Sequence, residues 1–250
     1  NNVQGASDAG LIPMVYPDYQ PVENKANQNK MQNFWNKNLD FNKGLTVVEI
    51  MEEVYAEKIK AMYVMGENPA MSDPDQEHTI DSICKLEHLV VQDIFMTETA
   101  WYADVIFPAS AHAEKEGTFT NTNRQIQIGR KVVPAPGDAR QDIDIIIDLA
   151  NRMGLNWDYK NVGEVYSEMS QIMPSLNNIS WERINKEESV TYPCDSKDLP
   201  GNEIVFSQNF PTESGLGKIV PTDIISPHEI PDSEYPFVLS TGRLLEHWHT

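Results

Sequence analysis

The stretch VVQDIFMTETAWYADVIFPASAHAEKEGTFTNTNRQIQ, residues 90–127, decides the fold class of this chain. A short apolar run at 89–91 stops at the polar pair Gln92-Asp93, and a second apolar run at 105–107 follows a helical start. Short apolar runs bounded by turn-forming residues are typical of buried strands. Because ligands of open parallel sheets lie outside the carboxyl ends of the strands, Asp93 is expected at a binding site.

The residues before this stretch predict alternating helices and strands. Thr46 and Glu49 have the spacing of a capping box, so we expect a helix to begin there. A strand is expected at 61–65, and a helix at 74–86, with Cys84 facing inward, leads into the first apolar run. This alternation is typical of a parallel sheet with right-handed crossovers. The predicted fold class is therefore α/β, a Rossmann-like parallel sheet flanked by helices.

Regular structure is also expected beyond this stretch. The alternation at 125–130 predicts a half-exposed strand, and apolar periodicity predicts helices at 142–153 and 162–173. We expect the first of these helices to end at Gly154, in the position that glycine favours after a helix. The residues that it should bury are Ile143, Ile146, Ile147 and Ala150.

The remaining segments carry weaker patterns. Residues 1–45 are rich in Asn, Pro and Lys and predict an irregular surface segment, and 174–232 predicts an irregular connection. An apolar run at 237–239 is expected to be the first strand of a second domain that starts at residue 233. Because the chain opens at Asn1 without an initiator methionine, we interpret it as an internal fragment of a longer polypeptide.

Composition argues against several classes of protein. The 250 residues include 19 Lys and Arg against 38 Asp and Glu, which gives a net charge of −19. Charge of this sign repels nucleic-acid phosphates and anionic lipid, so neither nucleic-acid nor membrane binding is expected. Cys84 and Cys194 are far apart and form no CxxC pair, which argues against a disulfide framework or a metal site here. No apolar run approaches the roughly 20 residues that cross a bilayer.

Two polar residues follow the strand at 89–91, and each has a structural and a functional interpretation. Asp93 has the position of a cap or turn former, but a carboxylate there also accepts two hydrogen bonds from a guanine edge. Gln92 beside it, at the same strand end, favours a ligand-binding role for Asp93. Thr97 suits a helix N-cap, and its hydroxyl with the helix N-terminus also suits a phosphate.

Three further candidates lie in turns or at a helix start. Asn68 belongs to the turn Gly66-Glu67-Asn68-Pro69, which matches neither a Walker loop nor a dinucleotide fingerprint. Lys115 stands between two glutamates, as in a solvated charge run, but beside a glycine turn it also suits a phosphate. Asp142 is a helix N-terminal acid, which the helix macrodipole favours whatever the function.

The run STGRLLEHWHT, residues 240–250, holds an unusual cluster of polar and aromatic side chains. His247 and His249 point to the same side if the run is extended, but no third or fourth ligand is near, which argues against a metal site. Arg243 suits a phosphate or pterin oxygen, and Trp248 suits stacking. The cluster indicates an anionic, planar, aromatic cofactor.

Six segments together resemble the molybdenum or tungsten bis-molybdopterin guanine dinucleotide oxidoreductases, and among them the catalytic (alpha) subunits of formate dehydrogenases. They follow the family's order over essentially the whole chain. The segments are NNVQGASDAG at 1–10, MGENP at 65–69, VVQDIFMTETAWYADVIFP at 90–108, EKEGTFTNTNRQIQ at 114–127, GDARQD at 137–142 and STGRLLEHWHT at 240–250.

The resemblance implies which part of the enzyme this chain represents. Residues 1–232 resemble part of the Rossmann-like third domain of the family, and 233–250 the start of the β-barrel fourth domain. The residues that would bind the guanine, ribose or phosphates are Asn68, Gln92, Asp93, Thr97, Lys115 and Asp142. Those of the loop around the pterin and pyrophosphate would be Thr241, Gly242, Arg243, His247, Trp248 and His249.

The resemblance also implies an activity, oxidation of formate to carbon dioxide in the full-length chain. The metal ligand, the active-site arginine and a 4Fe-4S cluster would lie upstream of Asn1, so no catalytic or metal-binding residue is expected in this part. Electrons would pass to iron–sulfur and flavin subunits that reduce NAD, and a cytoplasmic location is expected.

Three alternatives stay open at this stage. A nitrate reductase of the same superfamily would share the EKEG turn and the LEHWHT ending. A non-catalytic relative, the large iron–sulfur subunit of respiratory complex I, would keep the fold without the metal, although the intact Gly242-Arg243 pair argues against it. A generic nucleotide-binding α/β protein would bind a simple guanine nucleotide unaided.

Overall fold

The computed structural model describes residues 2–227, 230–240 and 242. The chain divides into two compact units, residues 1–203 and 204–250. Regular secondary structure of the described residues lies in the first unit, which contains two three-stranded sheets and a short two-stranded one.

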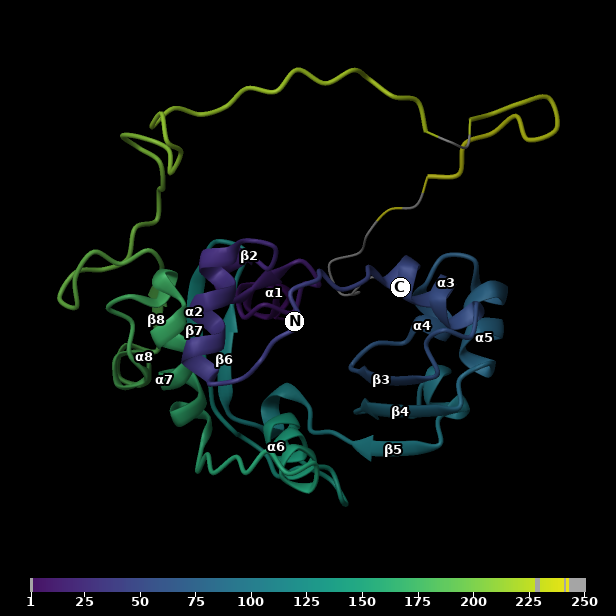
Figure 1. Cartoon of the computed structure of the whole chain (residues 1–250), viewed down its shortest axis with the longest axis horizontal. Coiled ribbons are helices and arrows are strands. Elements are labelled where there is room, and N and C mark those ends of the chain that lie inside the picture. Colours follow the sequence, from purple (N-terminus) through teal and green to yellow (C-terminus); the bar gives the residue numbers. More distant parts are fainter. Residues whose placement is uncertain (1, 228–229, 241, 243–250) are drawn as a thin grey trace. The chain divides into compact units, whose positions relative to one another are not determined.

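The first sheet confirms the predicted parallel sheet. Its strands are β3 (Ala61–Met65), β4 (His88–Asp93) and β5 (Val105–Pro108), in the order β3-β4-β5. Both pairings are parallel, with Met65 opposite Gln92 and Gln92 opposite Phe107. Figure 1 shows the three arrowheads pointing the same way, so the carboxyl ends of the strands share one edge.

Helices cover one face of this sheet. They are α4 (Pro69–Ser72), α5 (Gln76–Cys84) and the short 3-10 helix η2 (Thr99–Tyr102), and α3 (Val47–Tyr55) packs on α5. Val64, Leu89 and Val91 are buried against residues of α4, α5 and η2 in one hydrophobic cluster. Because side chains alternate along a strand, Tyr63, Met65, Val90 and Gln92 lie on the opposite face.

The expected start of α3 is confirmed. Thr46 Oγ1 accepts from the Glu49 backbone N–H, and the Glu49 carboxylate accepts from the Thr46 backbone N–H at 2.7 Å. Both halves of a capping box are therefore present, and they satisfy N–H groups that a helix start leaves unpaired. Within α5 the inward position of Cys84 is wrong, because its side chain is exposed and Ile83 takes the buried position.

The second sheet is antiparallel and has the order β6-β7-β8. Its strands are β6 (Gly117–Thr120), β7 (Gln125–Gly129) and β8 (Ser189–Thr191), and the 3-10 helix η3 (His112–Glu114) precedes them. The strand expected at 125–130 is confirmed by β7, with Ile126 buried. Helix α7 (Val162–Ile172) and the 3-10 helix η4 (Pro174–Leu176) confirm a helix that stops at proline.

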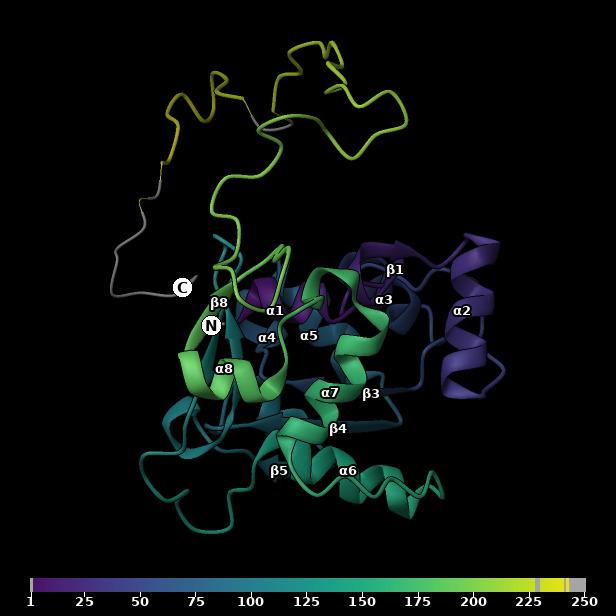
Figure 2. The same ribbon diagram turned by 90° about the vertical axis from the view of Figure 1, so that its left-hand side faces the viewer.

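A larger hydrophobic cluster underlies the second sheet. Tyr166 of α7 and Ile184 of α8 (Trp181–Glu187) are buried in it, together with Ile126 and Val190 of the strands. Helix α8 lies beside β7 and β8 (Figure 2). The Tyr166 hydroxyl is also satisfied, because it donates to the Ile179 carbonyl oxygen at 3.1 Å.

The Tyr166→Phe variant should change how stability depends on alkaline pH. Burial raises the pKa of the Tyr166 phenol above its ordinary value of 10. The unfolded chain therefore loses this proton from about pH 10 while the folded chain keeps it, so the stabilisation is complete below pH 10 and falls above it, by up to about 1.4 kcal/mol per pH unit.

We expect Tyr166→Phe to cost about 1 kcal/mol at pH 7 through the lost hydrogen bond, and to flatten the decline above pH 10. The measurement is the urea unfolding midpoint of both proteins at pH 7, 9, 10 and 11. Equal declines in the two proteins would contradict the raised pKa of Tyr166.

The first 45 residues differ from the expected irregular segment. They contain α1 (Val3–Asp8), β1 (Val15–Tyr16), the 3-10 turn η1 (Pro17–Tyr19), β2 (Gln20–Pro21) and α2 (Lys25–Trp35). Asn24 caps α2, because its side-chain oxygen accepts from the Ala26 and Asn27 backbone N–H groups. Met31 on α2 is fully buried in the larger cluster, and this tertiary packing outweighs the Asn-rich composition.

The connection expected from 174 to 232 is irregular only in part. Ser180 caps α8 by accepting from the Arg183 backbone N–H at 3.2 Å, and β8 pairs with β7. The pairing joins residues more than 60 positions apart, which no local pattern reveals. From Ile204 onward the described residues form no helix or strand, and the strand expected at 237–239 is not among the described elements.

Helix α6 (Asp142–Arg152) connects to the edge of the first sheet. Ala109 forms an isolated parallel bridge with Arg140, and the Ser110 N–H donates to the Arg140 carbonyl oxygen at 2.9 Å. The start of α6 is thereby fixed to the carboxyl end of β5. Gly154 follows the helix with a φ of 84°, as expected, because this left-handed conformation suits glycine.

The buried face of α6 differs in part from the prediction. Ala150 is buried as expected, but the other fully buried residue is Ile145. The remaining residues of the predicted set, Ile143, Ile146 and Ile147, are partly exposed and line a cavity. None of the helices in the described part of the chain combines the length and the apolar character that crossing a membrane requires.

Candidate functional site at the carboxyl edge of the parallel sheet

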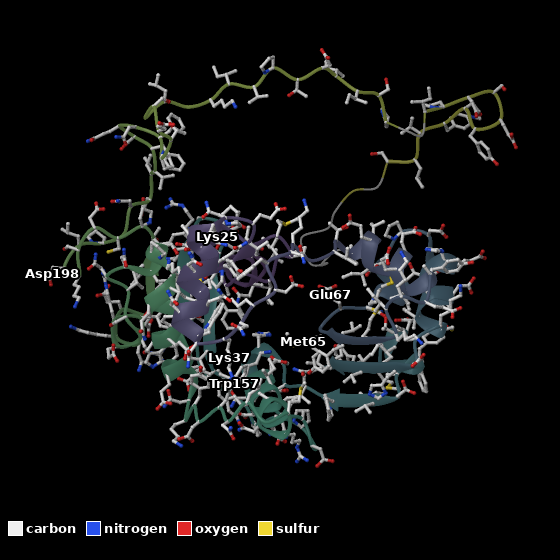
Figure 3. The ribbon with its side chains drawn as sticks, in the orientation of Figure 1. Lys25, Lys37, Met65, Glu67, Trp157 and Asp198 are labelled. Atoms are coloured by element: carbon white, nitrogen blue, oxygen red, sulfur yellow. The ribbon has the colours of Figure 1, made fainter. Side chains whose placement is uncertain are left out.

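Loops at the carboxyl ends of β3, β4 and β5 bring together the candidate residues of the described chain. Gly66 follows β3 with a φ of 65°, and its backbone N–H donates to the Gln92 carbonyl oxygen at 2.9 Å. Met65 and Glu67, labelled in Figure 3, mark this end of β3. The loop after β5 continues through η3 to Lys115.

A chain of four side chains crosses this edge. The Tyr63 hydroxyl donates to Gln92 Oε1, and Gln92 Nε2 donates to Asp142 Oδ1 at 2.7 Å. The other Asp142 oxygen, Oδ2, forms an ion pair with Lys115 Nζ. Asp142 therefore joins two other predicted site residues, Gln92 and Lys115, although the three belong to separate segments.

These groups differ in how much bonding capacity they have left. Gln92 is 1% exposed, its oxygen is occupied by Tyr63 and its amide faces Asp142. Both Asp142 oxygens are occupied. Lys115 is different: its side chain is 27% exposed, and among the described residues Asp142 is its acceptor, so two of three N–H donors are left for a ligand.

Asp93 lies at the same edge with half of its carboxylate engaged. Its Oδ1 accepts from the Ile94 backbone N–H at 2.6 Å and from the Phe95 N–H at 3.5 Å. Oδ2 has no partner among the described residues, so it can accept a hydrogen bond from an incoming N–H or O–H group. The turn-forming and the ligand interpretations of Asp93 are compatible in this geometry.

Asn68 joins the loop after β3 to the loop after β4. Its Oδ1 accepts from the backbone N–H and the hydroxyl of Thr99, at 3.0 and 2.8 Å. Its Nδ2 donates to the Glu98 carboxylate at 2.6 Å, and this hydrogen bond holds the pKa of Glu98 below its ordinary value. The sequence alone does not predict Glu98 and Thr99 as site residues, because their hydrogen bonds with Asn68 form only between the folded loops.

Two hydroxyl groups complete the edge. Thr97 Oγ1 accepts from the Ala100 backbone N–H at 3.2 Å, but the N-cap of the short 3-10 helix η2 is Glu98 and not Thr97 as expected. Ser110, which follows β5, is fully buried, and its Oγ has no hydrogen-bond partner among the described residues. A buried hydroxyl without a partner costs free energy, which marks this position as one that a bound group can satisfy.

A cavity of about 1500 Å³ borders the same carboxylate. Its wall is largely aromatic and aliphatic and is contributed by α2, α6, α7 and the segments that follow them. Lys37 and Trp157, labelled in Figure 3, both line it, and so does Asp142. Asp142 therefore stands between the edge of the sheet and an apolar cavity.

The other predicted site residues lie in the last ten positions. Thr241, Arg243, His247, Trp248 and His249 fall outside the described residues, and Gly242 is exposed. Within the described ranges no three His, Cys, Asp or Glu side chains are grouped to hold a metal ion. The described site is thus a polar edge where Lys115 has free donors, Asp93 has a free acceptor oxygen, and both oxygens of Asp142 are occupied.

Comparison with solved structures finds a similar fold for part of this chain. Acetylene hydratase from Pelobacter acetylenicus superposes with a TM-score of 0.50 at 23% sequence identity. The similarity covers 58% of this chain and 20% of that enzyme, and at this identity it shows the fold alone.

Comparison with curated sequences gives nearer relatives. F420-dependent formate dehydrogenase subunit alpha of Methanocaldococcus jannaschii is 42% identical over all of this chain, and formate dehydrogenase H of Escherichia coli is 35% identical over 99% of it. The assimilatory nitrate reductase catalytic subunit of Bacillus subtilis is 32% identical over the whole chain. The chain spans 37%, 35% and 36% of the lengths of these three proteins.

The family model agrees with these relatives. The model described as molybdopterin oxidoreductase matches residues 2–152, more than half of the chain, and the match includes every described candidate of the sheet edge. This confirms the family that the six sequence segments indicated. The chain belongs to the molybdopterin oxidoreductase family.

Proposed function

We propose that this chain is the part of a formate dehydrogenase catalytic subunit that binds the guanosine end of a molybdopterin guanine dinucleotide cofactor. The observation that carries the proposal is the network of Gln92, Asp142 and Lys115 at the carboxyl edge of the parallel sheet. Ligands of open α/β sheets bind at this edge. The relatives named formate dehydrogenase support the substrate, which is formate.

The residues at the edge fit the proposed cofactor. Lys115 offers two unused N–H donors to a phosphate, and Asp93 offers an acceptor to the N–H groups of a guanine edge. The unpartnered Ser110 hydroxyl adds a buried group that a ligand can satisfy. We assign to the same site Asn68, Gln92, Thr97 and Asp142, and to the pterin side Thr241, Gly242, Arg243, His247, Trp248 and His249.

These residues would contribute to the reaction by holding the cofactor in position. Formate oxidation releases carbon dioxide, a proton and two electrons, and the molybdenum or tungsten of the bound cofactor would receive the electrons. Lys115 and Asp93 would hold the guanosine end, and the Asp142 carboxylate would keep the Lys115 ammonium at the edge.

Asp93→Asn in the full-length protein should weaken cofactor retention. The substitution replaces one of two acceptor oxygens with an amide donor, so a guanine N–H would face another donor. We expect roughly 10-fold faster loss of guanine nucleotide on dialysis. Asp81→Asn, an exposed aspartate on α5, is the matched control and should leave retention unchanged. Equal retention in the two variants would exclude Asp93 from the site.

Activity of the full-length protein tests the substrate. We expect formate-dependent reduction of a viologen dye, and no nitrate-dependent oxidation of the reduced dye. Nitrate activity alone would assign the protein to the reductase branch, which the relative from Bacillus subtilis makes the second candidate. Neither activity, together with absence of bound metal, would favour the non-catalytic relative.

The proposal extends to domains, partners and location. Residues 1–232 would be part of the Rossmann-like domain and 233–250 the start of a β-barrel domain. Electrons would pass through a 4Fe-4S cluster to iron–sulfur and flavin subunits that reduce NAD, in the cytoplasm. Because the relative from Methanocaldococcus jannaschii is named F420-dependent, the assay of the purified complex should offer NAD and coenzyme F420 side by side.

A further inference from the structure

We propose that Tyr63 is a positioning residue of the cofactor site, acting on Lys115 through Gln92 and Asp142. The inference rests on the proposed function, because it concerns the same sheet edge. It follows from the hydrogen bonds that run without interruption from the Tyr63 hydroxyl to the Lys115 ammonium. No single sequence segment contains more than one of these four residues.

The Gln92 amide must present its amino group to Asp142. A side-chain amide has one end that accepts and one that donates, and the two ends are alike in shape. Asp142 needs the donating end, since a carboxylate accepts only. If the amide turned over, its oxygen would face the carboxylate, so Asp142 sets the orientation of the amide, and a contact at the other end holds the side chain in place.

Tyr63 supplies that contact. Its hydroxyl donates to Gln92 Oε1 on the side of β3, so the Gln92 side chain is bonded at both ends while Asp142 binds its amino group. Burial and the nearby Asp142 carboxylate both raise the pKa of the Tyr63 phenol, so the phenol stays protonated and remains a donor at neutral pH. The ring itself is held 6.4 Å from that of Phe107.

The remaining oxygen of Asp142 binds Lys115. With Oδ1 bonded to Gln92, Oδ2 faces Lys115 and holds the ammonium at the edge of the sheet. Gln92 is 1% exposed and has its oxygen occupied, so it connects Tyr63 to Asp142, whereas Lys115 is the group with donors left for a phosphate. Removing the Tyr63 hydroxyl should therefore change how the Lys115 ammonium is held.

A double-mutant cycle in the full-length protein separates positioning from a general structural role. The variants are Tyr63→Phe, Lys115→Ala and the double variant, and the readout is the rate of guanine nucleotide loss during dialysis. We expect Tyr63→Phe to speed loss by about 3- to 10-fold in the otherwise unchanged protein, but to have no further effect beside Lys115→Ala. Tyr102→Phe, which changes an exposed tyrosine at the end of η2, is the control without effect.

The possible results lead to different conclusions. If Tyr63→Phe speeds nucleotide loss equally in the otherwise unchanged protein and in Lys115→Ala, the inference is overturned, because the phenol would then act independently of Lys115. No effect of Tyr63→Phe, with a clear effect of Lys115→Ala, would overturn it and leave the proposed function standing. No effect of Lys115→Ala would contradict the proposed site, and the inference with it. The thermal unfolding midpoint of each variant shows whether its faster nucleotide loss comes from unfolding.

Discussion

Replacing Lys115 with alanine in the full-length protein is expected to cause the largest loss of cofactor among single substitutions at the sheet edge. A hydrogen bond from an ammonium to a phosphate contributes about 1.5–3 kcal/mol, which corresponds to roughly 10- to 100-fold in affinity. The variant also leaves the Asp142 carboxylate without its ion-pair partner and close to the incoming phosphate. The measurement is the molar ratio of guanine nucleotide and of metal to purified protein.

Lys60 provides a matched control for Lys115. It too forms an ion pair with a carboxylate, that of Glu87, but it precedes β3 and therefore lies at the amino-terminal end of the sheet. Lys60→Ala removes the same charge and the same kind of ion pair, and its exposed side chain contributes little to stability. We expect unchanged guanine and metal content. A similar loss in both variants would show that Lys115 acts only through net charge.

Ile184→Ala should give the largest loss of stability. Ile184 is fully buried in the larger hydrophobic cluster and connects α8 to the β6-β7-β8 sheet. Removing three carbon atoms from such a position loses their burial and leaves a cavity, which together cost about 2–5 kcal/mol. We expect a thermal unfolding midpoint several degrees lower, measured by calorimetry or by intrinsic fluorescence.

Two further variants identify the cause of this loss. Ile184→Val removes one methylene group and should cost about 0.5–1.5 kcal/mol, in proportion to the smaller cavity. Val132→Ala changes a side chain that is 79% exposed, so its midpoint should be unchanged. If Ile184→Ala were as stable as Val132→Ala, α8 would not be packed as described.

Local signals were enough to predict the parallel sheet. The strands at 61–65, 89–91 and 105–107 are short apolar runs that stop at glycine, at a polar pair and at proline, and all three were found. The capping box at Thr46 was equally readable, because both partners lie within one turn. Such features depend on residues close together in the chain.

Features that depend on distant residues could not be predicted in the same way. Strand β8 exists because it pairs with β7, and α2 is stable because Met31 enters a core whose other members come much later in the chain. Lys115 and Asp142 were each candidates, but their contact requires the Ala109–Arg140 bridge that brings the start of α6 to the sheet edge. The same holds for Tyr63, which reaches Gln92 only across the β3–β4 pairing.

Hydrogen–deuterium exchange of the full-length protein, with and without bound cofactor, tests most directly where the cofactor lies. We expect slower exchange of backbone amides at 94–98 and 111–117, the loops after β4 and β5, when the cofactor is bound. Amides at 58–60 and 85–88, at the amino-terminal end of the same sheet, should exchange equally in both states. Protection of the amino-terminal end, or equal exchange at both ends, would contradict a cofactor site at the carboxyl edge.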